Sequence, residues 1–339
     1  MKDFVFQTSA LFMFNTEVYK NIKIAKNYCQ LGDILDISVK LGKVKLENPT
    51  VLASGIMGVT GASMLFAAKN GAGALTSKSI GLHIREGHKC PIIAPVEGGF
   101  INAVGLCCQG IDECIDEIKY AVSNSNVPII ASIFASDVKE FGQVTKIISE
   151  AKPNLIEVNV SCPNVQNEFG KPFGMDPKIT RKVTEIVKNN TKIPVFIKLS
   201  PNTPDLKQIA KAVEEAGADG ITAINTVGPG MVININTGKP VLQNKAGGLS
   251  GPMIKPVAVR CVYDICSVTK IPIIGTGGVT YGKDAVEMMM AGASACGIGT
   301  AVNIRGIDVF RKVSDEIKEF MNENGYTKLK QIIGVAHDS

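Results

Sequence analysis

The chain has 339 residues, of which 45% are hydrophobic and 20% charged, a composition typical of a globular protein with a large core. Its net charge of +5 comes from 36 basic and 31 acidic residues without a basic block, which argues against a nucleic-acid partner. Nine cysteines, an odd number without CxxC spacing, argue against a disulfide framework and an internal zinc or iron–sulfur site, and predict a reducing cytoplasm.

Residues 1–33 precede the main fold. Their apolar stretch at residues 4–14 is interrupted by polar residues and is shorter than the ~20 residues that a membrane span needs. It also lacks a basic region and a small-residue cleavage site. We therefore expect a poorly ordered extension or a short packing helix, with a weak membrane or targeting element as the alternative.

From residue 36 on, two short alternating runs around Gly42 predict a small β-hairpin. Eight strand-like apolar runs then alternate with helical patterns, at residues 51–53, 74–77, 129–134, 155–160, 195–199, 220–224, 273–275 and 295–298. Such runs are typical of parallel strands buried on both faces. They predict one domain, residues 34–339, folded as a single (β/α)8 TIM barrel that a helix at 308–324 completes. An open doubly wound sheet is the alternative.

The active site of such a barrel lies at the carboxyl ends of the strands. Glycine- and proline-rich stretches follow the strands at 81–110, 161–177 and 226–252, where we expect catalytic loops. The strand ends carry polar or small residues, namely Ser54, Lys78, Asn159, Cys162, Lys198, Asn225, Thr226, Gly277, Gly278, Gly299 and Thr300.

Two lysines and two glycine-containing turns at this rim point to a ligand. One lysine at a strand end could be ion-paired or could extend to solvent. Two on one rim indicate cations for an anionic ligand or an electron-rich ring. A glycine pair alone is often only a tight turn. Two such turns next to helix N-termini indicate a phosphate site.

Cys162 follows the fourth predicted strand and precedes a proline. Free cysteines are most often buried small hydrophobic residues. Here Asn159, Ser161 and Asn164 would crowd a core but suit a polar pocket. The pattern therefore favours a functional thiol.

Nine motifs occur in order along residues 36–310: LASG at 52–55, TSKS at 76–79, INAVGL at 101–106, NVSCPNV at 159–165, IKLSPN at 197–202, INT at 224–226, GGLSGPMIKP at 247–256, GTGGV at 275–279 and GIGTA at 297–301. In these motifs the chain resembles the dihydroorotate dehydrogenase family. NVSCPN and GGLSG are highly specific, whereas GTGG fits many phosphate-binding barrels.

The resemblance implies flavin-dependent oxidation of (S)-dihydroorotate to orotate in de novo pyrimidine biosynthesis, with FMN as cofactor and no metal. It implies FMN contacts from Ser54, Lys78, Ser79, Asn102, Asn159, Lys198, Gly251, Gly277, Gly278, Gly299 and Thr300. It implies substrate contacts from Lys78, Asn102, Gly105, Leu106, Asn159, Asn164, Asn225 and Thr226.

Two residues would be catalytic. Cys162 would act as the base that removes the C5 proton while hydride passes from C6 to flavin N5, since a thiol of pKa ~8.5 can serve once polar neighbours favour its thiolate. Lys198 would stabilise the negative charge of the reduced ring. Asparagine amides match the amide edges of a pyrimidine, because they both donate and accept.

A cysteine at position 162 indicates the soluble class 1 enzymes, because membrane-associated class 2 enzymes carry serine there. LSGPMIKP and the FG at 173–174 are more like class 1B than the fumarate-reducing class 1A. Class 1B implies a homodimer and a second subunit that carries FAD and an iron–sulfur cluster and reduces NAD. The electron acceptor, NAD through such a partner or fumarate, stays open.

The chain departs from the family pattern in the loop after INAVGL, and two alternative functions stay open. After INAVGL the family usually continues Asn-Pro-Gly, whereas this chain has Cys107, Cys108 and Gln109, which leaves the local loop geometry open. A dihydropyrimidine dehydrogenase-like flavin oxidoreductase is the closest alternative, against which Asn164 argues. A non-redox phosphate-binding barrel is an alternative of a different class.

Overall fold

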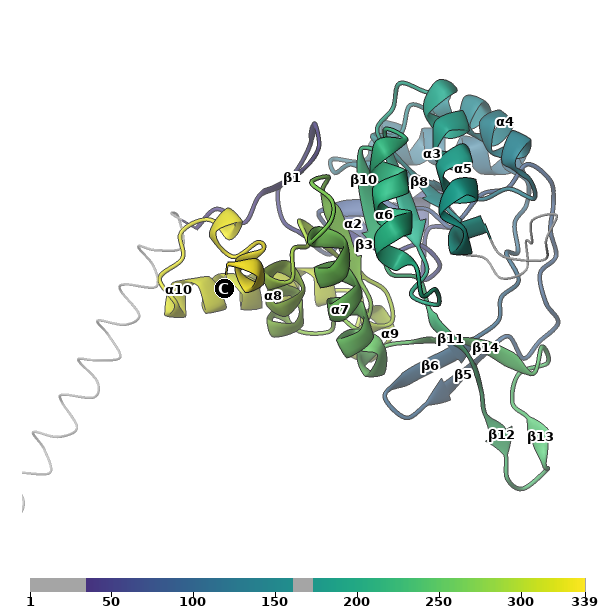
Figure 1. The fold of residues 1–339 in the computed structure, drawn as a ribbon. Helices are drawn as coiled ribbons and strands as arrows, with labels where there is room; N and C mark the ends of the chain where they lie inside the picture. Colours follow the sequence, from purple (N-terminus) through teal and green to yellow (C-terminus); the bar gives the residue numbers. More distant parts are fainter. Residues whose placement is uncertain (1–34, 161–172, 339) are drawn as a thin grey trace, which may run out of the picture.

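The computed structural model describes residues 35–160 and 173–338. Its centre is a closed barrel of eight parallel strands, partly ringed by helices (Figure 1). In order around the barrel, the strands are β10 (Gly220–Ala223), β15 (Ile273–Thr276), β16 (Ala295–Ile298), β3 (Thr50–Leu52), β4 (Ala74–Thr76), β7 (Ile129–Ile133), β8 (Leu155–Asn159) and β9 (Val195–Leu199). The predicted barrel is confirmed, and the open sheet is excluded because β9 pairs with β10 to close the ring.

The helices follow the strands in the order expected of a (β/α)8 barrel. They are α2 (Gly61–Lys69), α3 (Ile111–Asn124), α4 (Val138–Ser149), α5 (Pro177–Asn189), α6 (Leu206–Glu215), α7 (Lys255–Cys266), α8 (Gly282–Met290), α9 (Ala301–Arg305) and α10 (Val309–Glu323), with short 3₁₀ turns at Phe173–Met175, Pro252–Ile254, Leu329–Gln331 and Val335–His337. Local sequence fixes several starts. Asp137 and Asp176 cap α4 and α5 by accepting backbone N–H groups.

Burial explains why the barrel strands are apolar. Every residue of β7 and β9 is buried, because the barrel interior lies on one face and the helices lie on the other. The main exceptions are Ser132, Glu157, Lys198 and Thr222, which are polar and buried. Their position inside an otherwise apolar barrel marks them for the site described below.

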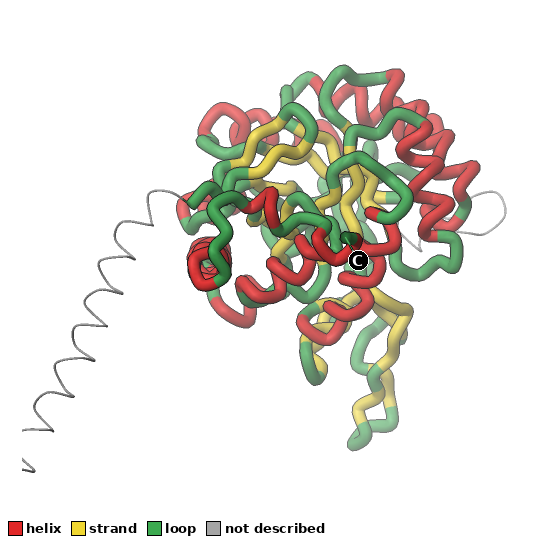
Figure 2. Tube along the Cα trace, turned by 60° about the vertical axis from the view of Figure 1, so that its left-hand side comes forward, coloured by secondary structure: helices red, strands yellow, loops and turns green. Residues whose placement is uncertain are grey.

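A second sheet covers the carboxyl-terminal end of the barrel. It is antiparallel, in the order β11 (Val227–Met231), β14 (Ala246–Ser250), β6 (Gly99–Asn102) and β5 (Ile93–Val96). A small hairpin of β12 (Ile233–Asn234) and β13 (Lys239–Pro240) extends beyond it (Figures 1 and 2). We expected only loops at 81–110 and 226–252. That expectation was incomplete, because these segments pair with each other across the rim.

The predicted N-terminal hairpin is present as β1 (Val39–Leu41) and β2 (Val44–Leu46), with Gly42 at φ 61° in the turn. Residues 1–33, the predicted extension, lie outside the described residues. No helix within residues 35–160 and 173–338 is long and apolar enough to cross a membrane.

The packing of α4 against the segment after β8 gives a stability prediction. Phe141 is fully buried, and its ring meets that of Phe173 edge-on, with centroids 5.8 Å apart. We expect Phe141→Ala to lower the free energy of unfolding by about 3–5 kcal/mol, because it leaves a cavity. The control is Phe66→Ala on α2, where the side chain is 52% exposed. Urea denaturation measures both, and equal losses would contradict the packing described.

Candidate functional site

A cavity of about 710 Å³ lies at the carboxyl ends of the barrel strands, between the barrel and the second sheet. It is lined by every predicted site residue that the structure describes: Ser54, Lys78, Ser79, Asn102, Gly105, Leu106, Asn159, Lys198, Asn225, Thr226, Gly251, Gly277, Gly278, Gly299 and Thr300. The other two, Cys162 and Asn164, lie outside the described residues. The structure therefore brings the sequence-predicted rim together in one place.

A buried ion pair lies at the barrel side of the cavity. Lys198 Nζ is 3.6 Å from Glu157 Oε1, and these side chains are only 7% and 3% exposed. Ser132 Oγ donates to the same carboxylate oxygen at 3.1 Å. Glu157 thus supplies a counter-charge that the sequence analysis missed. The available signal was a glutamate within the apolar run LIEVN.

Hydrogen bonds link that ion pair to the wall of the cavity. Ser79 Oγ lies 2.9 Å from Ser132 Oγ and 3.5 Å from Ser54 Oγ. Asn159 Nδ2 donates to Ser79 Oγ at 3.4 Å, and Asn225 Nδ2 donates to Asn159 Oδ1 at 3.3 Å. The amides from β8 and from the end of β10 are therefore held as a connected set of donors and acceptors.

The second sheet positions the opposite wall. Asn102 pairs with Gly248 in the β6–β14 register, and its Nδ2 donates to Gly248 O at 3.3 Å. Asn202, which the sequence analysis did not single out, donates to Thr226 O at 3.2 Å and accepts from Gly228 N at 3.0 Å. Its place in the IKLSPN motif was the only signal. These contacts fix the segment that carries Thr226.

Lys78 stands at the end of β4, half-buried, with its backbone N–H donating to Gly58 O at 3.0 Å. Within the described part of the chain, its ammonium group has no ion-pair partner. Lys78 is therefore a cation available to an anionic group in the cavity, whereas the charge of Lys198 faces Glu157.

Glycines form a cradle of backbone N–H groups at the ends of β15 and β16. The N–H groups of Gly278, Gly299 and Thr300 have no backbone acceptor among the described residues, and Gly277 follows the last pair of the β15–β16 ladder. Gly278 has φ 78°, and a Cβ there would lie 2.6 Å from Lys255 Cβ. Neighbouring N–H groups at two such turns are able to donate to an anion.

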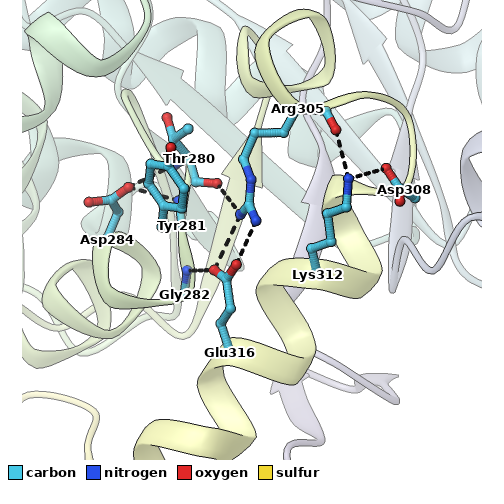
Figure 3. A network of polar contacts seen from close by, with 8 residues as sticks. All are labelled: Thr280, Tyr281, Gly282, Asp284, Arg305, Asp308, Lys312 and Glu316. Carbon is cyan, nitrogen blue, oxygen red and sulfur yellow. Dashed lines mark hydrogen bonds and ion pairs between the residues drawn. The ribbon is translucent and has the colours of Figure 1, made fainter.

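Acidic side chains hold this cradle in place. Asp284 Oδ2 accepts from the N–H groups of Thr280 at 3.0 Å and Tyr281 at 2.8 Å (Figure 3). The Lys255 ammonium lies 2.8 Å from Asp284 Oδ1 and 2.6 Å from Glu287 Oε2. Hydrogen bonds to these two carboxylates, Asp284 first, raise the pKa of Lys255. The charge of Lys255 is thus paired with these two carboxylates next to the cradle.

Arg305 ties the same loop to α10. Its guanidinium donates to Thr280 O at 2.9 Å and to both carboxylate oxygens of Glu316 at 3.2 and 2.6 Å (Figure 3). Glu316 also accepts from Gly282 N. This pairing cannot be read from the sequence, because nothing in the helical pattern of α10 distinguishes Glu316 from a solvent-exposed glutamate.

These features define a class of protein: a (β/α)8 barrel with a polar cavity at the carboxyl ends of its strands and glycine-containing turns along one side of that cavity. Among residues 35–160 and 173–338, no group of three or more His, Cys, Asp or Glu side chains is placed to hold a metal ion.

Comparison with known proteins identifies the family. The family model for dihydroorotate dehydrogenase matches residues 36–321, and the chain belongs to this family. It is 48% identical over 298 residues to a protein of Methanocaldococcus jannaschii, covering 87% of this chain and 96% of that protein. It is 45% identical over 296 residues to one of Methanosarcina acetivorans, covering 87% and 94%, and 44% identical over 301 residues to one of Thermoplasma acidophilum, covering 89% and 99%. All three are named dihydroorotate dehydrogenase B (NAD(+)), catalytic subunit. The expected class 1B resemblance is confirmed.

The buried ion pair gives a second stability prediction. Glu157→Gln removes the carboxylate that faces Lys198, and breaking a buried pair typically costs about 3 kcal/mol or more of unfolding free energy. Glu185→Gln on α5 is the matched control, since Glu185 is 47% exposed and its pair with Arg181 should contribute under about 1 kcal/mol. Urea denaturation measures the free energy of unfolding of both variants, and values equal to that of the parent protein in both would contradict the account.

Proposed function

We propose that this chain oxidises (S)-dihydroorotate to orotate in pyrimidine biosynthesis, with FMN and substrate together in the 710 Å³ cavity. The observation that carries the proposal is the convergence of all described residues implied by the family motifs on one cavity. Family membership and relatives of 41–48% identity that carry this activity in their names support it.

We assign the phosphate of FMN to the glycine cradle. Gly277, Gly278, Gly299 and Thr300 bring backbone N–H groups to one side of the cavity, and Thr300 Oγ1 donates to Ser250 Oγ at 3.0 Å. We assign the flavin ring and its ribityl chain to Ser54, Lys78, Ser79, Asn102, Asn159, Lys198 and Gly251. When bound, FMN supplies a ring that accepts a hydride. Adding a side chain to the cradle should therefore affect cofactor binding first.

The substrate fits the other end of the cavity. Orotate carries a carboxylate, and Lys78 is the cation without a described ion-pair partner. Its ring carries amide edges, and Asn102, Asn159 and Asn225 carry amides able to donate and accept. We assign further contacts to Thr226 and to the backbone of Gly105 and Leu106, and to Asn164, which lies outside the described residues.

Two residues carry the chemistry. Cys162 takes the proton from C5 of the substrate, an assignment that rests on the NVSCPNV motif because the residue lies outside the described part. Lys198 holds a positive charge where negative charge develops during hydride transfer. Glu157, held by Ser132, keeps that lysine in place and balances its charge. The alternatives, a dihydropyrimidine dehydrogenase-like enzyme and a non-redox barrel, have no comparable support from the relatives.

We further propose a homodimer that passes electrons to NAD through a second subunit carrying FAD and an iron–sulfur cluster. The name of the relatives, which describes an NAD(+)-linked enzyme and a catalytic subunit, supports the second subunit and NAD, whereas the dimer, FAD and the cluster rest on the class 1B resemblance. A cytoplasmic location rests on the odd number of cysteines without CxxC spacing. Adding NAD to the reduced protein, with and without a candidate partner, tests the electron route, with fumarate as the competing acceptor.

Gly278→Ala tests the cradle. The new methyl group would meet Lys255 Cβ at 2.6 Å and displace the loop. We expect FMN affinity, measured by flavin fluorescence quenching, to fall at least about tenfold, equal to 1.4 kcal/mol. Gly238→Ala in the β12–β13 turn is the control, because it also has positive φ, at 65°, but has open space around its Cβ position. Unchanged FMN affinity in Gly278→Ala would show that the cradle does not bind the cofactor.

Lys78→Ala tests the substrate cation. Losing a hydrogen bond to a charged group costs about 1.5–3 kcal/mol. Orotate affinity, followed by the visible absorbance of the flavin, should therefore fall by about tenfold or more. Lys69→Ala, at the exposed end of α2, is the control and should bind as the parent does. Equal orotate affinity in Lys78→Ala and Lys69→Ala would refute the assignment.

Cys162→Ala tests the base. The variant should retain flavin, while the rate of flavin reduction by dihydroorotate falls about 100-fold or more, because general-base catalysis typically contributes ~10²–10⁴. Anaerobic stopped-flow absorbance measures the rate, and flavin content is the control. Reduction at the parent rate would exclude Cys162 as the base.

A further inference from the structure

Two thiols lie next to each other beside the cavity, outside the residues assigned to catalysis. Cys108 Sγ is 3.9 Å from Cys114 Sγ. Cys108 is buried in the segment between β6 and α3, and Cys114 lies in the first turns of α3 and is partly buried. Gly110, with φ 88°, turns the chain between them so that the two side chains face each other. Within the described residues, no other pair of cysteine sulfur atoms makes such a contact.

The surroundings make the two thiols unequal. Cys108 Sγ accepts hydrogen bonds from the N–H groups of Gly81 at 3.4 Å and Gly110 at 3.3 Å, and it lies 3.9 Å from Cys114 Sγ, where either thiol can be the donor. The hydrogen bond from Cys114, the backbone bonds and the nearby charge of Lys78 outweigh burial and lower the pKa of Cys108 to about 6. The same hydrogen bond, together with burial, raises the pKa of Cys114. The pair thus combines a thiol of lowered pKa with a second thiol in contact with it, the arrangement of a reactive dithiol.

The other described cysteines lack this combination. Burial raises the pKa of Cys261, Cys266 and Cys296, which keeps their thiols protonated. Cys90 and Cys107 are exposed, and no sulfur contact holds either of them. Among the described cysteines, only Cys108 and Cys114 are therefore close enough to react with each other.

We propose that Cys108 and Cys114 form an oxidant-reactive dithiol site, which a peroxide converts to an intrachain disulfide. The Cys108 thiolate attacks one peroxide oxygen, the O–O bond breaks, and the leaving oxygen takes a proton to give water. The resulting sulfenic acid is attacked by the sulfur of Cys114, the S–O bond breaks, and the Cys114 proton leaves with that oxygen as a second water. The two sulfurs lose two electrons in total and the peroxide gains them.

Closing the disulfide must move the cavity wall. The sulfur atoms have to approach from 3.9 Å to about 2.05 Å. In the reduced form, Cys108 Sγ accepts hydrogen bonds from Gly81 N and Gly110 N, and it moves away from both when the disulfide forms. The backbone of Cys108 is paired in both directions with Arg85, at 2.8 and 2.9 Å. Arg85 Nε in turn donates to Gly105 O at 2.8 Å, in the cavity wall. Oxidation is therefore coupled to the segment that we assign to orotate, and this coupling alone rests on the proposed function.

Peptide mapping of the flavin-loaded full chain tests the disulfide directly. The protein is treated with hydrogen peroxide, remaining thiols are alkylated with iodoacetamide, and peptides are analysed by mass spectrometry. We expect a Cys108–Cys114 linked peptide, lighter by two hydrogen atoms, that dithiothreitol converts back to two thiols. In Cys114→Ser the linked peptide is absent and Cys108 is oxidised further, to the sulfinic acid. Cys266→Ser, on α7, is the matched control and retains the linked peptide.

The proposal is overturned if Cys108 and Cys114 are both still alkylated after the exposed Cys90 and Cys107 have been oxidised, or if Cys108 is linked to a different cysteine. The parent protein alone decides this, whether or not the variants fold. Coupling to the cavity predicts that the oxidised protein binds orotate about tenfold more weakly and that dithiothreitol restores the affinity. Unchanged orotate affinity in the disulfide form overturns the coupling. If the reduced protein does not bind orotate, that result counts against the proposed function. It leaves the disulfide itself untouched, because the peptide map does not depend on orotate binding.

Discussion

Closure of eight parallel strands is the constraint on which the rest of the molecule depends. Because the strands run in one direction, all their carboxyl ends lie on one rim, and residues far apart in sequence meet there. Ser54 and Thr300 illustrate this, since they follow β3 and β16, which pair directly in the barrel. No local interaction could bring them together, so the stability of the core and the geometry of the cavity have a common origin.

The two sides of the rim differ in their electrostatics. At the cradle, backbone N–H groups have no described backbone acceptor, while Asp284, Arg305 and Glu316 fix the loop next to them. At the barrel side, the Lys198 charge is matched inside the protein by Glu157. A buried pair of this kind contributes little to net stability, because desolvation offsets its attraction. The pair does, however, hold the Lys198 ammonium group beside the cavity.

How much the sequence predicts depends on the range of the interaction. Apolar runs such as those of β7 and β9 identify strands, because burial on both faces favours apolar side chains, with Ser132 and Lys198 as the polar exceptions. Glycines at the ends of β15 and β16 could also be identified, since their motifs combine small residues with a strand end. The second sheet could not be predicted. Its strands are short and half-exposed, and β6 pairs with β14 at Asn102 and Gly248, far apart in sequence.

The same limit applies to the site. Lys78 and Lys198 are recognisable in the sequence as cations at strand ends. The pairing of Lys198 with Glu157 is not, because it depends on the register of β8 and β9. Likewise, Cys108 and Cys114 are six residues apart, and only the turn at Gly110 makes them neighbours. Sequence motifs predicted which residues lie at the rim, whereas the structure shows which of them interact.

Anaerobic titration of the FMN-loaded chain with dihydroorotate tests the central claim most directly. If the rim holds flavin and substrate side by side, one equivalent of dihydroorotate should bleach the visible absorbance of the flavin and yield one equivalent of orotate. A flavin that stays oxidised in the presence of excess dihydroorotate, or a chain that takes up no FMN, would contradict the account.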